Sequence, residues 1–362
     1  MTHTARGQTE EESVLIEVKN LTKRYDDHLA VDNLSFTLEK GRILGFLGPN
    51  GAGKSTTMNI LTGYLSPTEG SILVKGIDMV KKPEKAKRCI GYLPEQPPLY
   101  PDMTVNEYLD FVAELKGIRN KADRAKAIAE AMEKTGIIEV SRRLIKNLSK
   151  GFKQRVGIAQ AIVTKPEIII LDEPTVGLDP VQIIEIRDLI KSLAGEHTVI
   201  LSSHILSEIS AVCDTVMIIN KGRLIVTDTT EGLAKHLSVR NGLKLTLKGD
   251  ADRAREILSA MEGVEEVETV KEEEDTVVLN VYTSADADIR ENVYFELAGA
   301  RIAVLEQAAL SMDLEEMFLE FIKESEENRL ETQDTVEPVT EETVSEEQIS
   351  EEKEEIKDES DI

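Results

Sequence analysis

Hydrophobic positions in the first two thirds of the chain predict strands that alternate with helices. Short, almost wholly apolar runs occur at residues 42–47, 168–171 and 198–201. Such runs predict strands that are buried on both faces, as in the middle of a parallel sheet. Shorter or alternating runs predict further strands at residues 14–18, 32–38, 88–93 and 215–219, and a strand with a turn at residues 71–79. The first two of these are expected to form an antiparallel pair, so the pattern predicts an α/β domain with a mixed sheet.

Apolar residues at helical spacing predict an insertion of helices within this domain. The first two helices are marked by Val105, Tyr108, Leu109, Val112 and Leu115, and by Ala125, Ile128, Ala129 and Met132. A third helix is expected after Ser149, whose side chain suits an N-cap, and Pro166 ends it. We expect these three helices to form a helical subdomain at about residues 97–165. A fourth helix is expected from Pro180 to Leu193.

A different pattern begins at Leu243. It predicts strands at residues 243–247, 264–270, 276–282 and 302–305, and helices at residues 251–261 and 287–298. The order β-α-β-β-α-β is typical of the ferredoxin-like arrangement. We therefore expect an α/β domain at residues 14–237 and a small α+β, ferredoxin-like domain at residues 240–323. The small domain is expected to end with an amphipathic helix at residues 313–322.

The charge of the chain is strongly acidic and unevenly distributed. Its 362 residues include 43 basic and 68 acidic ones, a net charge of −25. A nucleic-acid surface needs concentrated lysine and arginine, so no nucleic-acid partner is expected. Residues 324–362 hold 17 acidic and three basic residues and no aromatic one. This composition is typical of a disordered tail.

The sequence shows no membrane span, export signal or cysteine site. No run approaches the roughly 18 apolar residues of a spanning helix. Residues 1–13 lack the basic start and apolar centre of a signal peptide, so we expect a cytoplasmic chain without direct membrane insertion. Cys89 and Cys213 lie far apart and lack metal-ligand spacing, and are expected to pack as small apolar side chains.

The clearest chemical signal is the stretch GPNGAGKST at residues 48–56, between a predicted buried strand and a predicted helix. It matches G-x-x-x-x-G-K-[ST], a loop whose glycines turn backbone N–H groups toward a phosphate at a helix N-terminus. Lys54 is expected to reach the β- and γ-phosphates of ATP, Ser55 to bind Mg²⁺, and Thr56 to begin the helix. The expected nucleotide-binding residues of this stretch are Gly48, Pro49, Asn50, Gly51, Ala52, Gly53, Lys54, Ser55 and Thr56.

Tyr25 is the candidate for stacking on the adenine ring. It lies at the end of a polar stretch, just before a turn at Asp26 and Asp27. An exposed turn tyrosine without a ligand is the alternative interpretation.

Further motifs follow the phosphate loop in a fixed order. They are LSKGF at residues 148–152, Asp172-Glu173 at the end of an apolar strand, GLDP with Asp179, and a lone His204. In order and spacing, residues 14–237 resemble the ATP-binding subunit of ABC transporters. This resemblance implies a P-loop NTPase fold with a helical subdomain and an ATPase activity coupled to transport across a membrane. The second domain resembles the C-terminal extension of exporter-type ABC ATPases, which favours an exporter.

The resemblance also implies a head-to-tail dimer that encloses two ATP molecules. Each ATP lies between the phosphate loop of one copy and the LSKGF helix of the other. Ser149 and the N–H of Gly151 would contact the nucleotide of the partner copy, and Asp179 would couple the two sites. A helix N-terminus contributes only about 0.3–1 kcal/mol toward an anion, so closure must depend on two whole ATP-bridged sites.

In the same resemblance, Lys54, Glu173 and His204 are the catalytic residues. Asp172 would orient Mg²⁺ through water. Glu173 would act as the base that polarises the attacking water, and His204 would contact the γ-phosphate.

Two positions depart from the family pattern. The signature usually reads LSGGQ, and here Lys150 and Phe152 replace a glycine and a glutamine, while Ser149 and Gly151 are kept. The glutamine that normally senses Mg²⁺ and the membrane partner is replaced by Glu95, with Gln96 beside it. Either Glu95 takes the role, also as a metal ligand, or Gln96 moves into the site.

The resemblance implies a separate transmembrane permease as partner, docked between the helical subdomain and the Glu95-Gln96 loop. Attachment to the inner face of the cell membrane would then occur through this permease, and the ATPase subunits would form a homodimer or pseudo-homodimer. A non-transport ABC ATPase and a nucleotide-sensing regulator are the alternatives. The second domain carries no chemical motif and is expected to serve regulation or dimer contact.

Overall fold

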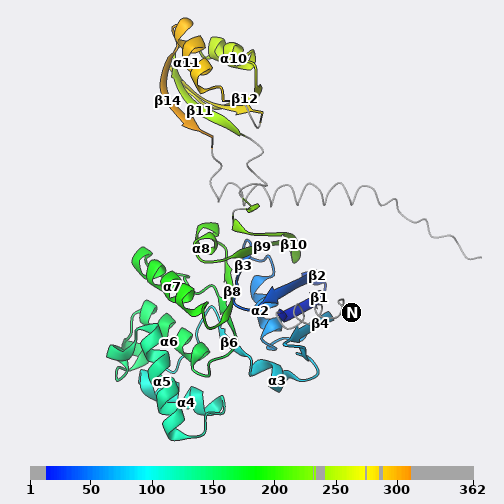
Figure 1. Ribbon diagram of the computed structural model, residues 1–362, viewed down its shortest axis with the longest axis vertical. Helices are drawn as coiled ribbons and strands as arrows, with labels where there is room; N and C mark the ends of the chain where they lie inside the picture. Colours follow the sequence, from blue (N-terminus) through cyan, green and yellow to red (C-terminus); the bar gives the residue numbers. More distant parts are fainter. Residues whose placement is uncertain (1–13, 231, 234–240, 274, 285–287, 311–362) are drawn as a thin grey trace, which may run out of the picture. The chain divides into compact units, whose positions relative to one another are not determined.

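The computed structural model describes residues 14–310, except for residues 231, 234–240, 274 and 285–287 (Figure 1). Residues 14–233 and residues 241–310 are described separately below. The predicted helix at residues 313–322 and the acidic tail at residues 324–362 lie outside the described residues.

The first sheet of residues 14–233 has four antiparallel strands in the order β2-β1-β4-β5. Their bounds are β1 Val14–Tyr25, β2 His28–Glu39, β4 Glu69–Val74 and β5 Ile77–Asp78. The predicted antiparallel pair is confirmed, and the register places Tyr25 opposite His28 across a two-residue turn. The prediction that the first strand ends at Val18 is wrong. The strand continues past Asn20, a residue with a positive φ of 50°, through an irregular register to Tyr25.

The second sheet is mixed and has the order β10-β9-β3-β8-β7-β6. Its strands are β3 Ile43–Leu47, β6 Ile90–Leu93, β7 Ile168–Asp172, β8 Thr198–Ser203, β9 Thr215–Asn220 and β10 Arg223–Asp228. All are parallel to their neighbours except β10, which pairs antiparallel with β9. Every residue of β3, β7 and β8 is buried, as their apolar sequences predict. The carboxyl ends of these three strands meet at one edge, where Leu47 faces Ser203 and Asp172 faces Ser202.

Helices follow or cover this sheet. They are α2 Lys54–Leu61, α3 Pro83–Lys87, α4 Val105–Leu115, α5 Lys121–Thr135, α6 Lys150–Ile162, α7 Pro180–Leu193 and α8 Leu206–Ser210. Two 3₁₀ turns, Ile138–Val140 and Ile145–Asn147, join α5 to α6. Figure 1 shows α4, α5 and α6 grouped together, as expected for the predicted insertion. Ser149 is the N-cap of α6, and its hydroxyl accepts from the Phe152 N–H, as predicted.

Alternation along the buried strands places two hydrophobic cores on the two faces of the mixed sheet. Ile43 and Leu47 of β3 belong to the core that includes the helical insertion. Leu44 and Phe46 belong to the core shared with the antiparallel sheet and α2. The mixed sheet is therefore fixed from both sides, and its carboxyl edge provides a rigid base for polar side chains.

Residues 241–310 have their own sheet and core. The elements are β11 Asn241–Lys248, α10 Ala251–Ser259, β12 Val264–Glu272, β13 Thr276–Thr283, α11 Arg290–Gly299 and β14 Ala303–Ala309. The strands are antiparallel in the order β12-β13-β11-β14. On β13 every second residue from Val277 to Thr283 is buried, and Leu258 of α10 and Val293 of α11 join the core. The predicted element order of residues 243–305 is confirmed, with bounds shifted by a few residues.

None of the helices in the described ranges has the length and apolar character that crossing a lipid bilayer requires.

The two cysteines are expected to differ in their reactivity toward thiol reagents. Burial raises the pKa of the Cys213 thiol above its ordinary value, whereas Cys89 is half-buried, and both are free thiols. Because only the thiolate reacts, a thiol reagent at neutral pH should label Cys89 first and Cys213 only after unfolding. Mass spectrometry of timed samples measures this order, and faster labelling of Cys213 in the folded chain would contradict it.

Candidate functional site

The phosphate-loop residues 48–53 connect β3 to α2 through a tight backbone path. Gly51 and Gly53 have positive φ angles of 81° and 99°, and Gly53 is the N-cap of α2. A Cβ atom on Gly53 would lie 2.5 Å from the Ala30 carbonyl oxygen, and one on Gly48 would lie 2.4 Å from the Ile219 carbonyl oxygen. Both positions therefore require glycine, and the loop can present its N–H groups without obstruction by side chains.

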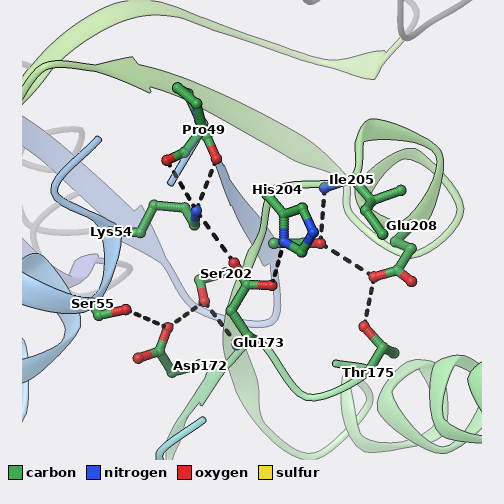
Figure 2. A network of polar contacts seen from close by, with 12 residues as sticks. Pro49, Lys54, Ser55, Asp172, Glu173, Thr175, Ser202, His204, Ile205 and Glu208 are labelled. Carbon is green, nitrogen blue, oxygen red and sulfur yellow. Dashed lines mark hydrogen bonds and ion pairs between the residues drawn. The ribbon is translucent and has the colours of Figure 1, made fainter. Parts of the chain in front are cut away.

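Lys54 is the first residue of α2, and its side chain is only 5% exposed. Its Nζ donates to the carbonyl oxygens of Gly48 at 2.8 Å and Pro49 at 3.3 Å. It also forms an ion pair with Glu173 Oε1 at 3.2 Å (Figure 2). The ammonium group is thus fixed beside the loop, where its charge is available to an anion.

Asp172 ends β7 and is buried beside the same loop. Its Oδ1 accepts from Ser202 Oγ at 2.6 Å and lies 3.4 Å from Ser55 Oγ. Burial raises the pKa of Asp172; hydrogen bonds from Ser202 and Ser55 oppose this shift, and the negative charges of Glu173 and Glu95 add to it. Because the ionised form of Asp172 is destabilised in this way, a nearby cation would stabilise it.

Glu173 follows Asp172 and lies between Lys54 and His204. Its φ angle of 48° is unusual for a residue with a side chain, and its N–H donates to Ser202 Oγ at 2.9 Å. Its Oε2 lies 2.9 Å from Nδ1 of His204, the first residue after β8. The three residues expected to be catalytic are therefore in contact through one carboxylate (Figure 2).

A cavity of about 350 Å³ lies over the phosphate loop. Ten of the predicted site residues line it, namely Tyr25, Asn50, Gly51, Gly53, Lys54, Ser55, Thr56, Glu95, Glu173 and His204. The sequence analysis missed His28, Ala30 and Val176, which also line it. A hairpin register with Asp26 and Asp27 as its turn would have placed His28 opposite Tyr25.

Tyr25 lies at the end of β1 and is 41% exposed. The Lys23 ammonium lies 5.1 Å from the centre of its ring, and it also donates to the Ser66 carbonyl oxygen at 2.9 Å. The tyrosine is therefore both exposed at a turn and part of the cavity wall. Its position is compatible with stacking on an adenine ring and with an exposed turn tyrosine that binds no ligand.

Glu95 and Gln96 differ in position. Glu95 lines the cavity over the phosphate loop, whereas Gln96 does not. Both line a second cavity of about 420 Å³, which also includes Leu99 and three lysines, Lys146, Lys150 and Lys153. Glu95 thus borders both cavities.

The residues assigned to the partner's nucleotide do not line the cavity of their own chain. Ser149 caps α6, and the Asp179 carboxylate caps α7 by accepting from Val181 N and Gln182 N at 3.1 and 3.0 Å. A Cβ atom on Gly151 would lie 2.9 Å from the Gln182 side chain, so the starts of α6 and α7 pack closely. Gly48, Pro49, Ala52, Asp172 and Gln96 are likewise absent from the cavity lining, although Gly48, Pro49 and Asp172 contact residues that form it.

A group of hydroxyl and carboxyl side chains behind the site was also missed. Ser202 joins Asp172 to the backbone of Glu173, and Glu208 of α8 accepts from Thr175 and Ser203. The signal that could have indicated them is the polar pair Ser202-Ser203 at the end of an apolar strand.

Comparisons with known proteins identify the family of this chain. The family described as "ABC transporter" matches residues 31–176. The bacitracin transport ATP-binding protein BcrA of Bacillus licheniformis is 44% identical over 215 residues, which are 59% of this chain and 69% of BcrA. The linearmycin resistance ATP-binding protein LnrL of Bacillus subtilis is 32% identical over 306 residues, 84% of this chain and 97% of LnrL. That match is longer than residues 14–237, so it includes residues outside this range.

Among solved structures, a dimeric post-hydrolysis state of the ATP-binding cassette MJ0796 bound to ADP and Pi superposes with a TM-score of 0.55 and 27% identity. The match covers 59% of this chain and 98% of that one. The family match and the similarity to LnrL over almost its whole length show that the chain belongs to the ABC transporter family as one of its ATP-binding subunits.

Proposed function

We propose that two copies of this chain close around two molecules of Mg-ATP, hydrolyse them, and so power export by a separate transmembrane permease. One observation carries this proposal. The buried Glu173 carboxylate lies between the Lys54 ammonium at 3.2 Å and the His204 imidazole at 2.9 Å, at the wall of the cavity over the phosphate loop.

ATP would bind with its phosphates on the N–H groups of residues 50–56, where the helix N-terminus favours an anion. Lys54 would bind the β- and γ-phosphates in exchange for part of its contact with Glu173, because one ammonium group has three hydrogen-bond donors. Tyr25 would stack on the adenine ring. Its other neighbour, the Lys23 ammonium, limits the orientations available to the ring.

Magnesium fits the oxygen groups at the end of β7. Ser55 Oγ and Asp172 Oδ1 lie 3.4 Å apart, and Mg²⁺ is usually bound by one or two such groups together with substrate phosphates. Glu95, on the cavity wall, would complete the protein's oxygen ligands. When bound, the ion would neutralise charge on the transferred phosphoryl group.

Glu173 would accept the proton of the attacking water while the bond between the γ-phosphorus and the β–γ bridging oxygen breaks. Its Oε2 lies 2.9 Å from Nδ1 of His204, so Nε2 of the same ring would be the nitrogen that contacts the γ-phosphate, as a donor when the ring is protonated. The positive φ of Glu173 and the Ser202 hydrogen bond to its backbone N–H fix the direction of the carboxylate.

The second copy would supply Ser149, Gly151 and Asp179 to each nucleotide. Two observations support this assignment: none of these residues lines the cavity of its own chain, and the related cassette MJ0796 has been solved as a dimer. Asp179 lies six residues after Glu173 on the same connecting segment, so a contact across the dimer would act on the segment that carries the catalytic carboxylate.

The permease would dock at the second cavity, which is bordered by Glu95 and Gln96 on one side and by the helical subdomain on the other. Glu95 also borders the nucleotide cavity. A ligand or partner in one cavity could therefore shift Glu95 and so change binding in the other. The chain would then lie at the inner face of the cell membrane. Export is favoured because LnrL, similar over 97% of its own length, is named for resistance to a compound.

Residues 240–323, of which 241–310 are largely described, would form a ferredoxin-like domain for regulation or dimer contact. The strand order β12-β13-β11-β14 with two helices supports this topology.

Co-purification from native membranes tests the proposed function. A tagged full-length chain should bring down a protein with several apolar spans, and ATP with Mg²⁺ should change the yield of that complex. Recovery with ribosomes instead, and without a membrane protein, would contradict the assignment to transport.

The choice between Glu95 and Gln96 gives a separate prediction. Because Glu95 borders the nucleotide cavity and Gln96 does not, Glu95→Ala should lower permease-stimulated ATP hydrolysis by about 10-fold or more. Gln96→Ala serves as the matched control and should have a smaller effect. An intact rate for Glu95→Ala together with a lost rate for Gln96→Ala would show that Gln96 is the sensor.

A further inference from the structure

A buried carboxylate outside the nucleotide cavity links the two segments that carry the catalytic residues. Glu208 lies on the short helix α8 and is 5% exposed. Its Oε2 accepts from Thr175 Oγ1 at 2.5 Å and from Ser203 Oγ at 3.2 Å. Thr175 lies two residues after Glu173, and Ser203 directly precedes His204, so Glu208 is bonded to both segments (Figure 2).

The direction of these hydrogen bonds is fixed by the neighbouring groups. Ser203 Oγ accepts from Ile205 N at 3.1 Å, so its own proton is available for Glu208. Two hydroxyl protons therefore point at one carboxylate oxygen, and an ionised carboxylate is an acceptor without a donor. Neither Lys nor Arg is paired with Glu208 among the ion pairs of the described residues. The two hydroxyl donors are its bonded partners there.

The segment held by Glu208 is one that needs external support. Glu173 has a positive φ, a conformation that costs a residue with a side chain of the order of 1–3 kcal/mol. Its carboxylate must also keep contact with both Lys54 and His204. Glu208 of α8 accepts hydrogen bonds from both Thr175 and Ser203. These two bonds connect the segment of Glu173 to the segment of His204.

We propose that Glu208 is a positioning residue for ATP hydrolysis, which sets the separation of Glu173 and His204 through Thr175 and Ser203. This inference rests on the proposed function of Glu173 and His204. Thr175 also lies between Glu173 and Asp179, so Glu208 connects the segment that leads to the proposed dimer contact with the segment of His204. A displacement of Asp179 would thereby be transmitted to the side chains of both Glu173 and His204.

The test compares the steady-state kinetics of full-length variants. Glu208→Ala removes the shared acceptor, and kcat should fall about 10- to 100-fold because small displacements at a reacting centre have effects of this size. The KM for ATP should change by less than about 3-fold, since the phosphate loop is untouched. Glu208→Gln keeps an acceptor oxygen and should recover most of the lost kcat.

Thr175→Val provides a second variant with little change in side-chain volume. It should lower kcat in the same direction, and the double variant with Glu208→Ala should lose less than the product of the two single effects. The matched control is Thr135→Val, which removes another fully buried hydroxyl, bonded to the Ala131 carbonyl oxygen far from this site in the sequence. It should lower thermal stability without lowering kcat.

Several outcomes would overturn the proposal. They are a kcat for Glu208→Ala equal to that of the parent, a loss confined to KM, or a double variant whose effects multiply. A loss of kcat in Thr135→Val as large as in Glu208→Ala would show that the loss in Glu208→Ala results from lower stability, and it would also overturn the proposal. A parent chain no faster than Glu173→Gln would instead contradict the proposed function, and the inference with it.

Discussion

Replacing Glu173 with glutamine is expected to lower the rate of ATP hydrolysis by about 100-fold or more, because general-base catalysis contributes about 10²–10⁴-fold. The amide has the shape of the carboxylate but cannot take up the proton of the attacking water. The backbone bond from Glu173 to Ser202 does not involve the side chain and should persist. ATP should bind as tightly as before or more tightly, since the variant removes a negative charge beside the phosphates.

Phosphate release and ATP binding by the full-length chain measure these two effects separately. The matched control is Glu196→Gln, which neutralises an exposed glutamate whose partner is Lys134, and it should hydrolyse ATP at the parent rate. Hydrolysis by Glu173→Gln within a few-fold of the parent would show that another group accepts the proton.

Replacing Lys54 with alanine is expected to raise the dissociation constant for ATP about 10- to 100-fold. Its buried ammonium lies beside the loop carbonyl oxygens and Glu173, where a charge-assisted hydrogen bond contributes about 1.5–3 kcal/mol. The variant also leaves the buried Glu173 carboxylate without this cation, so repulsion between Glu173 and the γ-phosphate should add to the loss.

Titration calorimetry with ATP and Mg²⁺ measures the affinity. Lys134→Ala removes an exposed lysine and is the matched control. Thermal unfolding of both variants without nucleotide separates a loss of binding from a loss of folded protein. An unchanged ATP affinity in folded Lys54→Ala would exclude this lysine from the phosphate site.

Much of the fold could be predicted because the central strands have unambiguous sequences. Residues 168–171 are wholly apolar, and the structure buries all of β7 between β8 and β6. The sequence analysis missed β10, whose six residues are mostly half-buried or exposed and which depends on antiparallel pairing with β9 across Lys221 and Gly222. It also missed α3, a five-residue helix with one buried side chain. Short elements like these are stabilised by tertiary contacts and carry little periodic signal.

The candidate site likewise has residues that the sequence indicates and hydrogen bonds that it does not. The sequence could indicate Lys54 and Glu173 because each belongs to a motif of contiguous residues, and His204 because it directly follows an apolar strand. The hydrogen bonds that position them could not be predicted, because Ser202 meets Asp172 across 30 sequence positions and Glu208 meets Thr175 across 33. The register of β7 and β8 brings Asp172 and Ser202 together, and the position of α8 brings Glu208 to Thr175. Asp179 shows a further limit, since the sequence indicates a contact between copies and the structure adds a cap for α7.

The proposed function requires that ATP is held between two copies of this chain. The most direct measurement is the mass in solution of the hydrolysis-deficient Glu173→Gln variant, by light scattering, with and without ATP and Mg²⁺. We expect a monomer without nucleotide or with ADP, and a dimer with Mg-ATP that is lost when Ser149→Arg blocks the start of α6. A variant that binds Mg-ATP and stays monomeric, even in the presence of its permease, would contradict the account.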